Sequence, residues 1–147
     1  MNIKDLLPPE CTLCRTQGSS KKRILQTISD IAVDYLPGLE EDDVLGSLIC
    51  REKMGSTGIG NGIAIPHGRL SGLTKVLAIL VTTDSPISYD AVDDKPVDIF
   101  LALLVPEDQA EGHLQTLAAI ASRLNDKGVV QKLRQAHSDQ ELYEAIT

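Results

Sequence analysis

The sequence has few aromatic residues and no long hydrophobic run. Its 147 residues include no Trp, one Phe and three Tyr, so aromatics make up only 3%. Proteins that stack single-stranded nucleic acid use exposed aromatic faces, and this composition argues against that class. No apolar run approaches the roughly 18 residues that a membrane-spanning helix needs. We therefore expect neither base stacking nor membrane insertion.

The sequence also has fewer basic than acidic residues. Fourteen Lys and Arg stand against 21 Asp and Glu, which leaves a formal net charge of −7 at pH 7. This sign opposes broad binding to a phosphate backbone, so nucleic acid is not an expected partner. The N-terminus has neither a charged leader nor a hydrophobic signal core. We expect one acidic domain over residues 1–147, located in the cytoplasm, with an irregular leader over residues 1–18.

Cysteine is limited to three residues, Cys11, Cys14 and Cys50. An odd number fits a reducing compartment better than a framework of disulfides. The first two form a C-x-x-C spacing, but a zinc site needs two further ligands at similar spacing, and none follows. A redox C-x-x-C is expected between a strand and a helix, and no clear strand precedes this one. We interpret the pair as small structural residues and expect no metal.

Hydrophobic spacing predicts helices toward both ends of the chain and strands in its middle. Ser19 and Ser20 offer an N-cap for the first helix, and Pro37 and Gly38 end that helix. A capping box from Ser138 to Glu141 begins the last helix. This order predicts an α/β layer structure around one small sheet. The first predicted helix lies between Ser20 and Pro37. The other predicted helices span about residues 40–52, 108–125, 127–136 and 138–146, and the predicted strands span residues 63–65, 76–83 and 97–105.

Residues 55–62 contain four glycines in eight positions. A dinucleotide-binding fingerprint that starts at Gly58 needs a glycine at position 63, where Ile63 stands. A Walker loop needs Gly-Lys-Ser or Gly-Lys-Thr, and the chain contains neither tripeptide. Two interpretations stay open: backbone N–H groups of this segment surround an anion, or the segment is a turn that packs tightly between a helix and a strand.

His67 follows the apolar residues 63–65 and lies between Pro66 and Gly68. Pro66 fixes its own φ and favours extended geometry before it, whereas Gly68 leaves the following turn free. The imidazole is therefore held at a defined place at the end of a strand and stays accessible. A lone histidine is more often structural than functional, so this position alone leaves both interpretations open.

His113 changes that balance. It shares a helical face with Leu117, Ile120 and Leu124, and this face must turn toward the sheet. A polar ring on such a face needs a hydrogen-bond partner, and two histidines beside the sheet could meet. His137 stands next to polar residues and is expected to be exposed.

The motifs of the chain argue for one chemistry over two others. The sequence contains no H-E-x-x-H, so two histidines are poor evidence for a metal. It also lacks the G-x-S-x-G elbow of serine hydrolases. A histidine beside glycine-rich backbone and cations suits phosphoryl transfer, in which an imidazole nitrogen attacks phosphorus and forms a phosphohistidine. Arg51, Lys53 and Arg69 are the candidates for stabilising the phosphoryl oxygens.

Residues 51–68 resemble the active-site signature of the fructose/mannitol-type enzyme IIA family; they read REKMGSTGIGNGIAIPHG. That family belongs to the bacterial phosphoenolpyruvate-dependent phosphotransferase system. The resemblance implies a small mixed β-sheet flanked by helices, the type 2 enzyme IIA fold. It implies that His67 accepts a phosphoryl group from an HPr-like histidine carrier, that His113 is a supporting donor and that Arg51 stabilises charge. It implies no cofactor.

Within that family the sequence is most similar to the nitrogen-related branch. This implies a phosphocarrier that regulates protein targets, such as potassium-transport or sensor-kinase components, according to its phosphorylation state. Two alternatives stay open: a sugar-specific enzyme IIA that passes phosphate to a IIB domain, and a binding module in which His67 is structural. We expect Ile59, Ile63 and Leu70 to form an apolar rim that meets the carrier.

Overall fold

The computed structural model describes residues 3–108 and 113–147, and for His113 and Leu114 it describes the backbone alone. Two short 3-10 turns, Ile3–Asp5 and Pro9–Cys11, open the chain. The strands are β1 (Thr12–Thr16), β2 (Gly58–Gly60), β3 (Ile63–Ala64), β4 (His67–Leu70), β5 (Leu77–Ile87) and β6 (Val97–Pro106). The α-helices are α1 (Lys21–Tyr35), α2 (Glu41–Lys53), α3 (His113–Leu124), α4 (Lys127–Gln135) and α5 (Asp139–Ile146).

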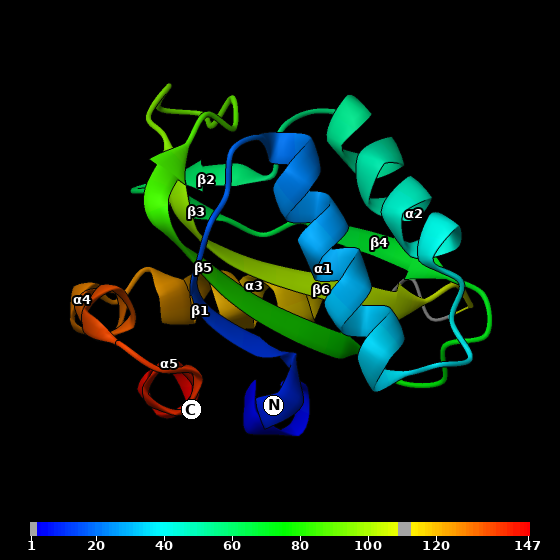
Figure 1. Ribbon diagram of the computed structural model, residues 1–147. Helices are drawn as coiled ribbons and strands as arrows, with labels where there is room; N and C mark the ends of the chain where they lie inside the picture. Colours follow the sequence, from blue (N-terminus) through cyan, green and yellow to red (C-terminus); the bar gives the residue numbers. More distant parts are fainter. Residues whose placement is uncertain (1–2, 109–112) are drawn as a thin grey trace.

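The strands form one mixed six-stranded sheet, which confirms the predicted α/β fold (Figure 1). Their order is β1-β5-β6-β3-β2, and β4 also pairs with β6. β5 and β6 run antiparallel, whereas β3 and β4 run parallel to β6. α1 and α2 lie over one face of the sheet and α3 crosses the other face, so the sheet is the middle layer. Within the described part of the chain, no helix has both the length and the apolar character that crossing a bilayer requires.

β5 and β6 supply the centre of the core. Leu80 and Leu101 are partners in the antiparallel register, and both are fully buried. Strands that are buried on both faces are almost continuously apolar, which is why the sequence predicted these two. β5 runs to Ile87, beyond its predicted end at residue 83, after a register shift that follows Thr82.

The predicted irregular leader over residues 1–18 is wrong where β1 forms. β1 pairs in parallel with β5 at the edge of the sheet. Leu7 and Cys11, which precede it, are buried in the core. The strand was missed because it shows no alternation of apolar and polar residues. It is only five residues long, its register shifts after Leu13, and Arg15 takes a positive φ of 51°.

Polar side chains fix the starts of the helices. Ser20 Oγ accepts a hydrogen bond from Arg23 N–H, and Ser138 Oγ accepts one from Glu141 N–H. Both contacts confirm the predicted N-caps, since they satisfy N–H groups that lack a partner in the first turn. The second predicted helix is observed one residue later at each end, as α2.

The contact between α2 and β4 decides which side chains face the site. A Cβ atom on Gly68 would collide with the side chain of Ser47, so the glycine lets α2 pack directly on β4. Side chains alternate between the two sides of a strand. Because position 68 faces α2, the side chains of His67 and Arg69 point to the other side.

Candidate functional site

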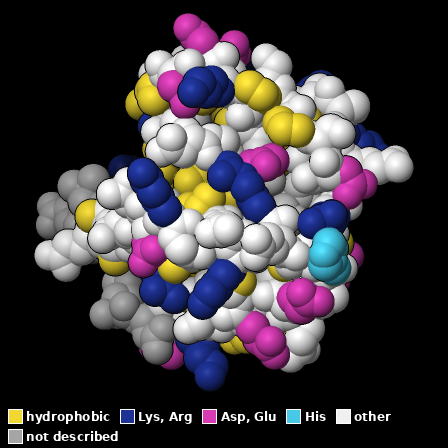
Figure 2. Space-filling model, turned by 90° about the vertical axis from the view of Figure 1, so that its left-hand side faces the viewer, with side chains coloured by type: hydrophobic (Ala, Val, Ile, Leu, Met, Phe, Trp, Pro, Cys, Tyr) yellow, Lys and Arg dark blue, Asp and Glu magenta, His cyan; other side chains and the backbone are white. Residues whose placement is uncertain are grey.

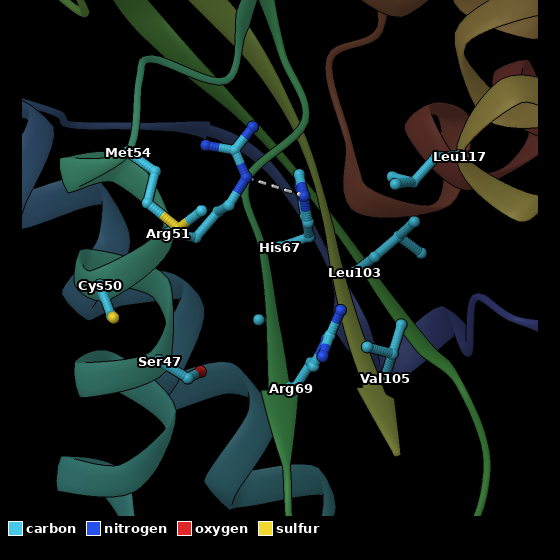
Figure 3. Close-up of a pocket in the computed structure, with 10 residues that line it drawn as sticks. Ser47, Cys50, Arg51, Met54, His67, Arg69, Leu103, Val105 and Leu117 are labelled. Atoms are coloured by element: carbon cyan, nitrogen blue, oxygen red, sulfur yellow. Dashed lines mark hydrogen bonds between the residues drawn. The ribbon is translucent and has the colours of Figure 1, made fainter. Parts of the chain in front are cut away.

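A cavity of about 610 Å³ lies where α2, β4, β6 and α3 meet. α2 contributes one wall, the neighbouring strands contribute the floor, and α3 contributes Leu117 opposite α2 (Figure 3). Apart from His67 and two arginines, the lining is largely apolar or small. The lining residues are Ser47, Cys50, Arg51, Met54, His67, Gly68, Arg69, Leu103, Val105 and Leu117.

Hydrogen bonds orient the imidazole of His67. Its Nδ1 lies 2.9 Å from the carbonyl oxygen of Ile65. A carbonyl only accepts, so Nδ1 carries the proton and Nε2 is left with a lone pair. Arg51 Nε donates to this Nε2 at 3.1 Å (Figure 3). Of the two ring nitrogens, Nε2 is thus the one whose lone pair is directed at Arg51, while Nδ1 is committed to the backbone.

Arg51 reaches the imidazole from the last turn of α2. Its Nη1 donates to the carbonyl oxygen of Gly55 at 2.8 Å, so the guanidinium is held by the backbone of the glycine-rich segment. The guanidinium contacts the imidazole through Nε, and its remaining N–H groups are of the kind that bind anionic oxygens. The predicted association of Arg51 with His67 is therefore present in the geometry.

Burial lowers the pKa of His67 below its ordinary value of 6.5. The neighbouring Arg51 guanidinium lowers this pKa further, while the hydrogen bond to Ile65 and the charge of Glu52 raise it. The net direction is downward, so the neutral imidazole is the main form at neutral pH. A neutral imidazole, whose Nε2 carries a lone pair and no proton, is the form that can act as a nucleophile once Arg51 releases it.

The other predicted cations divide into two groups. Arg69 lines the same cavity as His67, because both side chains leave β4 on the same side. Lys53 does not: it is exposed and borders a separate hollow between α1 and α2. His137 is exposed, as predicted.

His113 is the first residue of α3, and its side chain lies outside the described residues. Its role therefore stays a prediction. Leu117, one helical turn further along, lines the cavity. That contact brings α3 beside the site that contains His67.

The predicted apolar rim is wrong for two of its three residues. Ile63 and Leu70 are 2% and 5% exposed and belong to the core. Ile59 is 44% exposed, and Met54, which the sequence analysis did not single out, is 80% exposed at the cavity wall. The hydrophobic run that contains Ile63 does not reveal which of its residues face solvent.

Sequence reasoning also missed Ser47 and Cys50 in the cavity wall. Both lie on α2 at three- and four-residue spacing from Arg51 and Met54, so the helical period could have placed them on one face with Arg51. Cys11, Cys14 and Cys50 are free thiols. Cys11 is buried, which raises its pKa to about 12 and agrees with its interpretation as a structural residue.

Comparison with protein families matches residues 5–147 to "Phosphoenolpyruvate-dependent sugar phosphotransferase system, EIIA 2". The match spans nearly the whole chain, and the chain belongs to this family. The resemblance seen in residues 51–68 is confirmed.

Individual relatives place the chain more closely within the family. It is 49% identical to "Nitrogen regulatory protein" of Klebsiella oxytoca, covering 100% of this chain and 91% of that protein. Among solved structures, nitrogen regulatory protein IIA-Ntr of Neisseria meningitidis superposes with a TM-score of 0.90 at 34% identity, covering 99% of both chains. A fructose-specific EIIA component of Haloferax volcanii is less similar, with 31% identity over 99% of this chain and 94% of that protein.

Proposed function

We propose that this chain is a phosphocarrier and regulatory enzyme IIA of a nitrogen phosphotransferase branch. In this proposal, Nε2 of His67 accepts a phosphoryl group from an HPr-like histidine carrier. The observation that carries the proposal is the pair of hydrogen bonds that commits Nδ1 to Ile65 and directs Nε2 at Arg51. Membership of the enzyme IIA family supports the class of reaction.

The transfer exchanges one N–P bond for another. The lone pair of Nε2 attacks phosphorus in line with the leaving nitrogen, and the N–P bond of the carrier breaks as the new bond forms. The electron pair of the broken N–P bond returns to the imidazole of the carrier. The Nδ1 proton stays on His67 and keeps its bond to Ile65. Arg51 Nε releases Nε2 during this step, and the guanidinium then donates to the phosphoryl oxygens.

His113 completes the proposed machinery as a supporting hydrogen-bond donor. The position of Leu117 in the cavity wall supports this assignment, since residues four apart share a helical face. Such a donor contributes mainly when charge shifts onto the phosphoryl oxygens in the transition state.

The regulatory part of the proposal concerns partners and location. The relative at 49% identity is a nitrogen regulatory protein, whereas the fructose-specific relative reaches 31%, which favours regulation over sugar uptake. The proposed targets are components of potassium transport or sensor kinases, bound according to the phosphorylation state. The proposed location is the cytoplasm, with the chain acting as one domain.

Incubation of the purified chain with a phosphorylated HPr-like carrier tests the proposal. We expect His67→Ala to stay folded and to accept no phosphate, while the matched variant of an exposed histidine, His137→Ala, is phosphorylated like the native chain. The label should be lost in acid, because a phosphoramidate hydrolyses readily at low pH. Label on His67→Ala, or an acid-stable label, would contradict the proposal and favour a binding module or a hydroxyl acceptor.

A further inference from the structure

A buried carboxylate lies next to the site without a role in the proposed transfer. Glu52 follows Arg51 in α2, and its side chain is only 5% exposed. Its Oε2 lies 2.8 Å from Lys21 Nζ of α1, and its Oε1 accepts a hydrogen bond of 3.0 Å from Tyr89 Oη. It also accepts hydrogen bonds from the N–H, at 3.2 Å, and from the hydroxyl of Thr57. The carboxylate is therefore fully engaged within the protein.

A gain in stability is by itself a weak explanation for the ion pair between Glu52 and Lys21. Removing two charges from water costs free energy that their mutual attraction often fails to recover, and apolar replacements are often neutral or stabilising. Tyr89 adds a second contact to this ion pair, since Lys21 Nζ lies 4.6 Å from the centre of the fully buried Tyr89 ring. The arrangement fixes the position of Glu52, and Glu52 in turn fixes Thr57.

Thr57 connects this carboxylate to the imidazole. The carbonyl oxygen of Thr57 accepts a hydrogen bond of 3.0 Å from Ile65 N–H. The carbonyl oxygen of Ile65 then accepts the 2.9 Å hydrogen bond from Nδ1 of His67. A continuous path of hydrogen bonds therefore runs from Glu52 through two backbone residues to the nitrogen that does not react.

The same segment also holds the other side of the imidazole. Arg51 donates to Nε2 of His67, and its Nη1 is tied to the carbonyl oxygen of Gly55. Two side chains therefore fix the backbone of residues 51–57: Arg51 binds the carbonyl of Gly55, and Glu52 binds Thr57. A shift of this segment would move the partners of both imidazole nitrogens together.

We propose that Glu52 is a positioning residue that holds His67 in the Nδ1–H tautomer, through Thr57 and the carbonyl of Ile65. The carboxylate does not touch the phosphoryl group. Its contribution is to keep the Ile65 carbonyl where it accepts from Nδ1, so that the lone pair stays on Nε2. The effect on transfer rests on the proposed function of His67, whereas the effect on the tautomer does not.

Three variants separate positioning from general support of the fold. Glu52→Gln combined with Lys21→Met removes both charges but keeps an acceptor for Thr57. Glu52→Ala combined with Lys21→Met removes the acceptor and leaves no unpaired ammonium. Tyr89→Phe is the matched control: it deletes a hydroxyl that donates to the same carboxylate and lies 3.2 Å from Thr57 Oγ1, but it leaves the hydrogen bonds from Thr57 to Glu52 in place. The readouts are the ¹⁵N shifts of the His67 imidazole, the rate of transfer at saturating carrier and the melting temperature.

We expect the Gln/Met variant and Tyr89→Phe to keep the Nδ1–H tautomer and a near-native rate. We expect the Ala/Met variant to populate both tautomers and to lose about 10- to 100-fold in rate, as when an outer hydrogen-bond partner of a metal-bound histidine is removed. A folded Ala/Met variant with a native tautomer would overturn the proposal. A Tyr89→Phe variant that shifts the tautomer equally at equal loss of stability would also overturn it.

The native chain supplies a test that needs no variant. Its His67 spectrum should show Nδ1–H as the main form at neutral pH, and a predominant Nε2–H form would refute the inference even if the Ala/Met variant failed to fold. If Glu52 controls the tautomer but the native chain accepts no phosphate, the proposed function fails and the positioning role stands.

Discussion

At the scale of single residues, the reactivity of His67 depends on how its two nitrogens are shared. Nδ1 is committed to a backbone carbonyl, and Nε2 faces the cavity with an arginine N–H in front of it. In the proposed transfer this arginine has opposite effects before and after the step, because it covers the lone pair of the free imidazole and would stabilise the oxygens of the phosphorylated one. On this proposal we expect the approach of an anionic phosphoryl group to draw Arg51 away from Nε2.

The lowered pKa of His67 predicts an unusual pH dependence. Burial and then Arg51 disfavour the protonated imidazole, so Nε2 is mostly unprotonated at pH 6.5 and takes up a proton only at lower pH. The rate of phosphoryl transfer onto the chain should remain high as the pH falls through 6.5 and decline only at lower pH. Single-turnover transfer from a phosphorylated carrier across this range measures it, and a half-maximal rate at or above pH 6.5 would contradict it.

The same shift affects stability with a definite sign. In the unfolded chain His67 binds a proton below pH 6.5, whereas the folded chain resists that proton until lower pH. The free energy of unfolding therefore falls as the pH drops from 6.5 toward the folded pKa, and the His67 contribution is constant below that value. In urea titrations at about pH 7.5 and about pH 5.5, the native chain should lose more stability than His67→Ala.

His113 provides a third prediction at this scale. We expect His113→Ala to lower the rate of transfer by about 100- to 1000-fold, the typical cost of losing one donor to a charged transition state. His113→Gln keeps a donor of similar reach and should be far less impaired, while both variants stay folded. Transfer by His113→Ala at the native rate would show that His113 has no part in the chemistry.

At the scale of elements, the contact between α2 and β4 carries Arg51 to His67. Gly68→Ala places a methyl group against Ser47 and should cost about 1–3 kcal/mol in the free energy of unfolding. It should also slow transfer, because α2 moves away from β4. Gly46→Ala is the matched control on the exposed side of α2, where a Cβ meets nothing within 4 Å. We expect it to stabilise by about 0.5–1 kcal/mol without changing the rate.

Adding Ser47→Gly to Gly68→Ala should restore much of the lost stability and rate, since it removes the side chain that the new methyl group meets. Urea unfolding and the transfer assay measure both quantities. Equal stability of Gly68→Ala and the native chain would refute this account of the α2–β4 contact.

The sequence predicted the elements that carry strong periodicity or caps. α1 and α5 begin at the predicted serines, and β5 and β6 are apolar enough to be recognised alone. β1 was missed because so short a strand can pair with β5 at the edge of the sheet without any alternation of apolar and polar residues. The motif also predicted that Arg51 meets His67, but hydrogen bonds between residues distant in the chain, such as Glu52 to Tyr89, follow from tertiary packing and leave no local pattern.

At the scale of the whole molecule, the acidic charge is unevenly distributed. Lys and Arg side chains gather across the face toward which α4 and α5 lie, around a hollow with hydrophobic side chains (Figure 2). α4 contributes Lys127, Lys132 and Arg134, and Arg134 is paired with Asp98. By contrast, the first turn of α2 carries only acidic charge, at Glu41, Asp42 and Asp43. The first turn of α2 thus contributes part of the net charge of −7, whereas α4 carries only basic charged residues.

The net charge predicts how the chain would meet the proposed carrier. A carrier with basic residues around its own histidine is attracted by a partner of charge −7, and such steering raises the association rate more than the strength of the complex. Salt screens it, with a Debye length of about 10 Å at about 0.1 M. Between about 0.05 M and about 0.5 M salt, kcat/KM for transfer should fall by about tenfold or more. The rate at saturating carrier should stay constant, because His67 and Arg51 are held within the cavity by hydrogen bonds that screening barely affects.

A constant melting temperature over the same range serves as the control. If kcat/KM did not change with salt, the encounter would depend on the apolar contacts at Met54 and Ile59, and the acidic surface would have no part in it.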